Sequence, residues 1–147
     1  MTNKTKTHAL YLLSRRDHSK AELATKLKTK GHERADIEFA LNELIAEGYL
    51  NESRFTENFI HWRRQKGYGP ERIAMELNSR GITDTMIAEQ LNFTDNAWFI
   101  EARKVRVKHF KNQIVGDFKA KAKQMRFLQY RGFTHEQIKY AMLSNHT

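Results

Sequence analysis

The sequence predicts an all-α protein made of three tandem three-helix repeats, each similar to a helix-turn-helix unit, that form an elongated, curved array. Three observations support this prediction: a pattern that recurs about every 50 residues, a glycine in each copy that would end a helix, and helix-start signals at matching places. The 147 residues include only one proline and seven glycines, so few positions would interrupt a helix. Repeats of this size bury part of their core against their neighbours.

The repeat is centred on Gly31, Gly81 and Gly132, which follow one another at intervals of 50 and 51 residues. A leucine lies four residues before each glycine, a basic residue directly before it, an isoleucine six residues after it and a further apolar residue ten after it. The matched residues are Leu27, Leu77 and Leu128; Lys30, Arg80 and Arg131; Ile37, Ile87 and Ile138; and Leu41, Leu91 and Met142. Each copy is therefore predicted to be a helix, a glycine turn and a second helix, since a left-handed glycine commonly ends a helix.

Helix-start signals agree with this register. The predicted starts are a capping box at Ser19 and Glu22, a second at Thr134 and Gln137, a cap at Thr83 and a first-turn proline at Gly69-Pro70. A further amphipathic helix is predicted upstream of each pair, over about residues 7–16, 53–66 and 95–112, which gives nine helices. The predicted domains are residues 1–49, 50–93 and 94–147.

The composition excludes several classes of site. There is no cysteine, so the chain has neither disulfides nor thiolate metal sites, in keeping with a reducing cytoplasm. The longest apolar run, residues 9–13, is too short for a signal peptide or a membrane span. No two of the seven histidines lie three or four residues apart, so no helical turn presents a histidine pair to a metal. We therefore expect a cytoplasmic protein without metal, cofactor or membrane contact.

Residues that could serve catalysis have simpler structural explanations. Acidic residues such as Glu43, Glu47 and Glu52 fall at polar helix positions among lysines and arginines, as expected of a solvated face. The serines stand near helix ends without the strand-turn-helix elbow of serine hydrolases. Gly67 and Gly69 resemble a fragment of a phosphate loop, but no predicted strand precedes them. The sequence thus predicts a protein that is not an enzyme.

The positive charge points to a polyanionic partner, such as nucleic acid, an acidic protein surface, or both. The net charge is +9, and residues 99–131 alone carry ten lysines and arginines against two acidic residues, a net +8. Residues 63–69 form a second basic cluster, at a helix end, where stabilisation of the helix dipole is the alternative explanation. The predicted partner-binding residues are Arg63, Arg64, Lys66, Tyr68, Arg72, Arg80, Arg103, Lys104, Arg106, Lys108, Lys111, Lys119, Lys123, Arg126 and Arg131.

Several motifs in the centre of the chain carry a family resemblance. They are a Gly-Tyr-Leu turn at residues 48–50, Arg-Phe at 54–55, Lys-Gly-Tyr-Gly-Pro at 66–70 and Ile-x-x-Glu-Leu at 73–77, with less specific matches at 16–23 and 127–133. On these residues, over about positions 8–143, the chain resembles the RecX family, the regulators of the RecA recombinase. One departure is Asn51-Glu52, where family members often carry an acidic pair. Asn51 can still cap a helix there, whereas a role for a second carboxylate is not expected.

The resemblance implies a helical array that binds in the groove of the RecA–DNA filament. Family members inhibit RecA's ATP hydrolysis, strand exchange and co-protease activity, so the implied role is a negative modulator in DNA repair, recombination and the SOS response. The expected partners are the RecA filament and single- or double-stranded DNA, contacted by the basic surface of a monomer. No membrane partner is expected.

The alternative is a DNA-binding protein of the helix-turn-helix type that acts without a recombinase partner. Such a protein would present arginine, asparagine or glutamine at the start of a recognition helix. The segments at residues 32–34, 82–84 and 133–135 supply a single arginine among them. Phosphate contacts are therefore expected rather than base readout.

Overall fold

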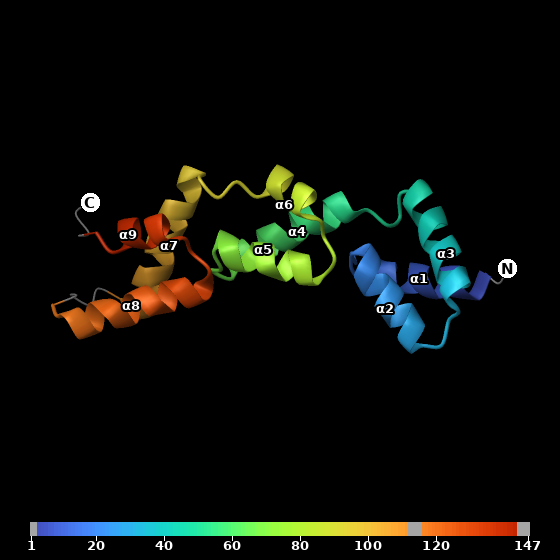
Figure 1. Cartoon of the computed structure of the whole chain (residues 1–147), viewed down its shortest axis with the longest axis horizontal. Helices are drawn as coiled ribbons and strands as arrows, with labels where there is room; N and C mark the ends of the chain where they lie inside the picture. The colour runs from blue at the N-terminus through green and yellow to red at the C-terminus, as the bar shows by residue number, and fades with distance from the viewer. Residues whose placement is uncertain (1–2, 112–115, 144–147) are drawn as a thin grey trace. The chain divides into compact units, whose positions relative to one another are not determined.

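The computed structural model describes residues 3–111 and 116–143, and it is helical throughout, with no strand among those residues (Figure 1). The helices are α1 (Asn3–Arg15), α2 (Lys20–Thr29), α3 (Arg34–Ala46), α4 (Glu52–Gln65), α5 (Pro70–Ser79), α6 (Asp84–Gln90), α7 (Asn96–Phe110), α8 (Phe118–Arg131) and α9 (His135–Ala141). The all-α fold of repeated three-helix groups is thus confirmed. The predicted end of the seventh helix at Asn112 lies outside the described residues.

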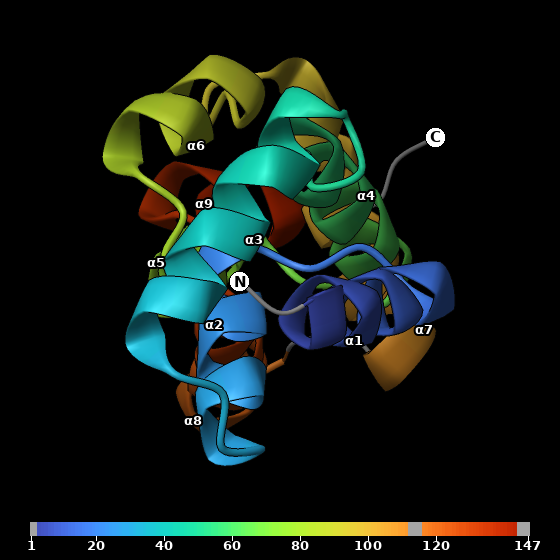
Figure 2. The ribbon, with the colours of Figure 1, turned by 90° about the vertical axis from the view of Figure 1, so that its right-hand side faces the viewer.

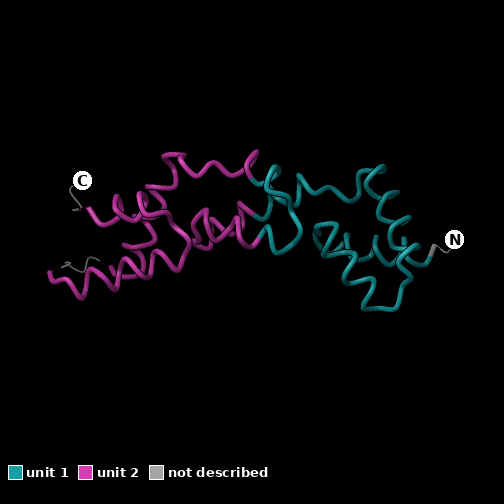
Figure 3. The backbone as a smooth tube through the Cα atoms, viewed as in Figure 1, with its two compact units in different colours: residues 1–59, 77–87 teal, residues 60–76, 88–147 magenta. Residues whose placement is uncertain are grey.

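The chain divides into two compact units (Figure 3). Unit 1 comprises residues 1–59 and 77–87, and unit 2 comprises residues 60–76 and 88–147. The division falls within α4, α5 and α6, so each of these helices contributes residues to both units. The domain boundaries predicted at residues 49/50 and 93/94 remain a prediction.

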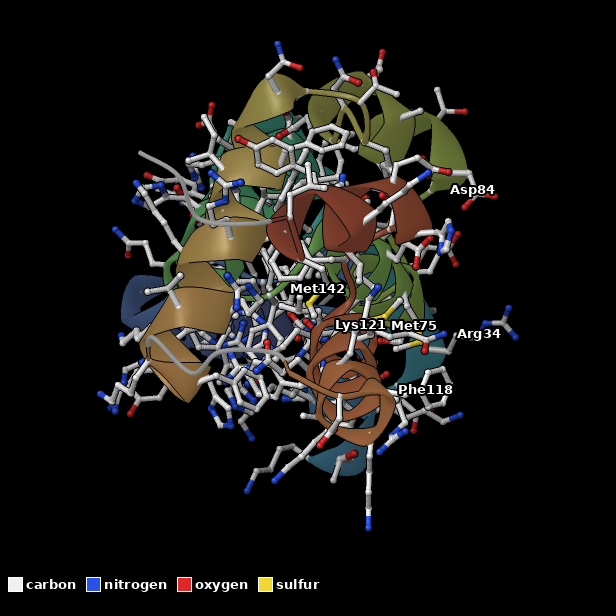
Figure 4. The ribbon with its side chains drawn as sticks, turned by 90° about the vertical axis from the view of Figure 1, so that its left-hand side faces the viewer. Arg34, Met75, Asp84, Phe118, Lys121 and Met142 are labelled. Atoms are coloured by element: carbon white, nitrogen blue, oxygen red, sulfur yellow. The ribbon has the colours of Figure 1, made fainter. Side chains whose placement is uncertain are left out.

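The core of unit 1 lies among α1, α2 and α3, which pack against one another (Figure 2). Its buried residues are Ala9, Leu23, Leu27, Ile37, Leu41, Leu44 and Leu50. In unit 2, α7 packs along α9, and α8 packs against both of these helices. Trp98, Leu128 and Phe133 are almost completely buried there. Met142, which follows α9, points toward α8 (Figure 4).

The repeat register predicted from the sequence is confirmed in both units. The leucines four residues before the glycines are fully buried, and the isoleucines six residues after them are between 5% and 7% exposed. Gly31, Gly81 and Gly132 have φ angles of +92°, +83° and +99°, the left-handed conformation that L side chains rarely adopt. Both predicted capping boxes form, and the hydroxyl of Thr83 accepts a hydrogen bond from the Met86 amide.

One type of helix junction occurs in both units. In unit 1 the first turn of α2 meets the end of α5, where the Ser19 hydroxyl donates to the carbonyl of Arg80 at 2.6 Å. In unit 2 the first turn of α5 meets the end of α8, where the Gly69 amide donates to the carbonyl of Arg131 at 2.7 Å. In each junction a donor at the start of one helix bonds a carbonyl that the end of another helix leaves unpaired. The positive end of one helix dipole therefore lies next to the negative end of the other. The junctions therefore follow from the repeat.

Two structural absences hold for the described part of the chain. None of its helices combines the length and the apolar character needed to cross a lipid bilayer. Within the same residues, no three histidine, aspartate or glutamate side chains gather in a way that could hold a metal ion.

Candidate nucleic-acid interface

A basic cleft of about 410 Å³ lies in unit 2, between the end of α4 and the facing sides of α7 and α8. Among the residues that line it are Arg64, Lys66, Glu101, Lys104, Lys108, His109, Phe127 and Arg131. Cationic side chains from the end of α4, from α7 and from α8 therefore line the same cleft. This basic cleft joins members of both clusters that the sequence predicted, residues 63–69 and residues 99–131.

Lysines supply most of the unneutralised charge in the basic cleft. Lys104 and Lys108 are four residues apart on α7, so they lie on the same helix face, and both are exposed. Arg64 differs, because its guanidinium pairs with the Glu101 carboxylate and stacks 4.0 Å from the Trp98 ring centroid. Among the described residues, no carboxylate lies within 4.0 Å of the ammonium groups of Lys66, Lys104 or Lys108. The cleft thus presents a net positive field.

A cluster of arginines surrounds the ring of Tyr68 beside this cleft. The guanidinium carbons of Arg63, Arg72 and Arg131 lie 3.9, 4.6 and 5.0 Å from the ring centroid, distances at which cation–π attraction is favourable. The Glu76 carboxylate accepts two hydrogen bonds from Arg63, at 2.8 and 2.7 Å, and one from Arg72 at 3.2 Å. A hydrogen bond with Tyr130 is the main cause that raises the pKa of Arg72. One carboxylate therefore offsets only part of three fixed positive charges.

The junction between α5 and α8 positions this arginine cluster. Besides the Gly69 amide, the Glu71 amide donates to the carbonyl of Gly132 at 2.9 Å. A Cβ added to Gly69 would lie 2.5 Å from the Gly132 backbone, so only glycine permits this approach. Arg131 then reaches back and donates to the Lys66 carbonyl at 2.9 Å. The junction thereby links the arginine cluster to the basic cleft.

A separate basic stripe runs along α8. Lys119, Lys123 and Arg126 are exposed and lie four and three residues apart, so they share one helix face. Tyr130, four residues further along, is 71% exposed on that face. These predicted residues lie together as a surface stripe, whereas none of them lines the basic cleft.

Arg106 is a correction to the predicted set. It is only 4% exposed and donates hydrogen bonds to the Ala141 carbonyl, at 2.7 Å, and to Gln124 Oε1, at 3.2 Å. Burial is the main cause that lowers its pKa, and the charge of Arg103 lowers it further. Arg106 thus ties α7 to the end of α9 and to α8, and a buried side chain cannot contact a partner at the surface.

The remaining predicted residues do not line the basic cleft. Arg80 belongs to unit 1, where it lies 3.4 Å from the Glu22 carboxylate and over the Phe59 ring. Arg103 places its guanidinium carbon 4.6 Å from the centroid of the Tyr140 ring. Lys111 is exposed directly after α7, with a φ of +61°. The structure therefore does not unite the fifteen predicted residues in one site.

The prediction missed four residues of α7 and α8 that are exposed or line the basic cleft. His109 and Phe127 stack in the cleft with their ring centroids 3.9 Å apart. Because they are 18 positions apart on different helices, only tertiary packing reveals this pair. Lys121 is exposed on α8, as is Phe118, which is 87% exposed (Figure 4). The alternation of lysines at positions 119, 121 and 123 was the available signal for Lys121.

Comparison with models of known protein families shows to which family the chain belongs. The model of the first three-helix domain of RecX matches residues 6–44, that of the second matches residues 51–91 and that of the third matches residues 101–142. The chain belongs to the RecX family. The resemblance inferred from the central motifs is thereby confirmed.

Similar proteins named Regulatory protein RecX occur in several bacteria. The protein of Halorhodospira halophila is 42% identical over 133 residues, which cover 90% of this chain and 83% of that protein. The protein of Vibrio parahaemolyticus is 40% identical over 141 residues, covering 96% and 91%. The crystal structure of RecX from Lactobacillus salivarius is 20% identical, with a TM-score of 0.81 over 95% of this chain and 93% of that one, which supports the fold. The relatives are thus named as regulators.

Proposed function

We propose that this RecX-family chain is a negative modulator of the RecA recombinase that binds in the groove of the RecA–DNA filament. In this proposal it inhibits ATP hydrolysis, strand exchange and co-protease activity, and it acts in the cytoplasm as a monomer in DNA repair, recombination and the SOS response. Its role is regulatory and not catalytic. Membership of the RecX family supports a regulatory role. The basic cleft is the observation that supports contact with DNA in the filament.

The basic cleft fits DNA phosphates better than base edges. Lys66, Lys104 and Lys108 are exposed ammonium groups, which attract phosphate through charge with little geometric selectivity. Base readout needs side chains such as asparagine or arginine at the start of a helix in the major groove. Among the third helices of the repeats, α6 and α9 start with Asp84 and His135, and only α3 starts with an arginine, Arg34. We therefore propose that DNA is held by its backbone while the protein partner supplies specificity.

Inhibition follows if the bound chain restrains the filament. ATP hydrolysis in a filament requires its protomers to change conformation, and a ligand that binds one conformation more tightly shifts the population toward it. A chain that contacts both the phosphate backbone and a protomer would oppose that change. It would do so without a catalytic group of its own.

The test is RecA's single-stranded-DNA-dependent ATP hydrolysis, with this chain added at well below one molecule per RecA. We expect hydrolysis to fall at ratios at which free DNA is not sequestered, as judged by anisotropy of a labelled oligonucleotide in parallel. No effect on hydrolysis, together with tight and salt-sensitive binding to free DNA, would favour the direct DNA-binding alternative.

Two matched variants test the basic cleft itself. Lys104→Glu/Lys108→Glu reverses two cleft cations, and Lys28→Glu/Lys30→Glu makes the same change of net charge at exposed positions of unit 1. We expect the cleft variant to bind DNA much more weakly and to show a shallower dependence of log K on log salt, by about 0.9 for each phosphate that it no longer neutralises. An equal weakening in both variants would assign binding to net charge rather than to the cleft.

A further inference from the structure

Tyr130 is an aromatic residue that the fold leaves at the surface of unit 2. It lies in the last turn of α8 and is 71% exposed. The matched positions of the other two repeats, two residues before the repeat glycine, carry Thr29 and Ser79. The repeat therefore does not require an aromatic ring at this position, and so exposed a ring adds little to the core. The groups around the ring indicate which partner it suits.

Arg72 lies against the Tyr130 ring and holds it in place. Its guanidinium carbon is 4.9 Å from the ring centroid, and its Nη1 donates a hydrogen bond to the Tyr130 carbonyl at 3.2 Å. Arg72 is itself fixed, because its Nε donates to the Glu76 carboxylate at 3.2 Å. Since Tyr130 is 71% exposed although Arg72 lies against it, most of the ring surface remains open to a partner.

Tyr130 continues the basic stripe of α8, which consists of Lys119, Lys123 and Arg126. At 3.6 residues per turn, the four positions fall within about 60° of the helix circumference and extend along about 16 Å of its axis. The three cations are exposed, and among the described residues no carboxylate lies within 4.0 Å of their charged groups. Because α8 itself contains no acidic residue, the stripe offers a partner three positive charges beside an open aromatic ring.

A strand of nucleic acid carries both kinds of group that this surface suits. Its phosphates are attracted to lysine and arginine, and its bases stack on aromatic rings. An acidic protein segment offers carboxylates to the cations, but it has no regular series of flat faces for the ring. In a duplex each base is stacked between its neighbours, which cover its faces, whereas a single strand can turn a base face outward. The surface therefore favours a single strand.

We propose that Tyr130 is a stacking platform for a base of single-stranded DNA whose phosphates lie along the basic stripe of α8. The inference rests on the proposed function and adds to it a DNA contact outside the basic cleft. Stacking on Tyr130 is independent of sequence, because every base has a flat π-face. It therefore distinguishes single strands from duplexes without readout of base edges.

The test separates the ring from the charges. Tyr130→Ala removes the ring, Tyr130→Phe keeps it, and Tyr11→Ala is the matched control at an aromatic residue of α1 that is 57% exposed. Fluorescence anisotropy measures the affinity of each full-length chain for three labelled oligonucleotides of equal length: a single strand, a duplex, and an abasic strand that has the same phosphates without bases. Far-UV circular dichroism checks that the variants keep their helices.

We expect Tyr130→Ala to bind the single strand about tenfold more weakly, as loss of one stacked aromatic ring produces. Its affinity for the duplex and for the abasic strand should equal that of the wild type, and Tyr130→Phe and Tyr11→Ala should behave as the wild type with all three oligonucleotides.

Unchanged binding of the single strand by Tyr130→Ala would overturn the stacking contact and leave the proposed function in place. An equal loss of affinity for all three oligonucleotides would also overturn it, since the ring would then act on phosphate contacts and not on a base. If the wild-type chain bound none of the oligonucleotides, the DNA contact of the proposed function and this inference would both be rejected.

Discussion

The two compact units use their surface charges differently. In unit 1, the cations Lys6, Arg54 and Arg80 each lie within 3.5 Å of a carboxylate of the same unit. In unit 2, Glu76 and Glu101 pair with arginines, and the exposed lysines of the basic cleft have no carboxylate within 4.0 Å among the described residues. Ion pairs within a unit leave little field outside it, whereas an excess of one sign attracts a polyanion. This difference supports the proposal that a polyanion binds unit 2. Three predictions examine the cations of α7, the helix junctions and the buried histidine of unit 1.

The largest effect is expected within unit 2, where neighbouring cations of α7 have different roles. Arg106→Glu puts a carboxylate beside the Ala141 carbonyl and Gln124 in a buried position, and we expect it to lower the free energy of unfolding by about 3–5 kcal/mol. Lys104→Glu makes the same change of charge at an exposed position, and we expect a change of about 0.5 kcal/mol or less. Urea denaturation followed by circular dichroism measures both.

Equal stability of these two variants would show that Arg106 is not a structural residue. DNA affinity is the complementary control, because it should fall in Lys104→Glu although this variant stays folded. A folded Lys104→Glu variant with unchanged DNA affinity would remove Lys104 from the interface.

Much of the fold could be predicted because the repeat constrains it at every level. The buried leucines, the left-handed glycines and both capping boxes depend on short-range spacing, which a sequence displays directly. The site was harder to predict. Lys104 and Arg106 are alike in sequence, and only the packing of α7 against α8 and α9 decides which of them is buried. The stacking of His109 on Phe127 depends on the same packing.

The second prediction compares the repeat glycines at the two helix junctions, Gly81 and Gly132, with Gly31, whose turn takes part in neither junction. Alanine at Gly31, Gly81 or Gly132 imposes the same left-handed strain, about 1–2 kcal/mol. At Gly31 no atom lies within 4 Å of the added Cβ, whereas at Gly81 it would lie 2.6 Å from Ala21 Cβ and at Gly132 it would lie closer still to Arg72 Cβ. We therefore expect Gly81→Ala and Gly132→Ala to lose about 1–3 kcal/mol more than Gly31→Ala.

Thermal and urea unfolding of the three variants measure this difference. Equal losses of stability would mean that both junctions adjust to accommodate the added Cβ. Left-handed strain at the turn would then account for the whole loss of stability. A loss confined to Gly132→Ala would instead show that the junction of unit 2, which touches Arg72 backbone atoms as well as side chain, is the more rigid of the two.

The smallest effect is a dependence on pH that we expect from unit 1. His18 is buried, its Nδ1 lies 3.0 Å from the Arg16 carbonyl and its Nε2 lies 2.9 Å from the Lys26 ammonium. Burial is the main cause that lowers its pKa, and the charges of Arg16 and Lys26 lower it further, although the Arg16 carbonyl and Glu22 oppose them. The unfolded chain therefore binds a proton at a higher pH than the folded chain does.

The stability that comes from neutral His18 is consequently complete above its unfolded pKa of about 6.5 and is lost as the pH falls below that value. Urea unfolding of the wild-type chain and of His18→Gln at pH 7.5 and pH 5 measures this contribution. The wild type should lose more stability than the variant between the two pH values, because only the wild type takes up a proton at position 18. An identical loss in both proteins would show that the burial of His18 does not cause the pH dependence.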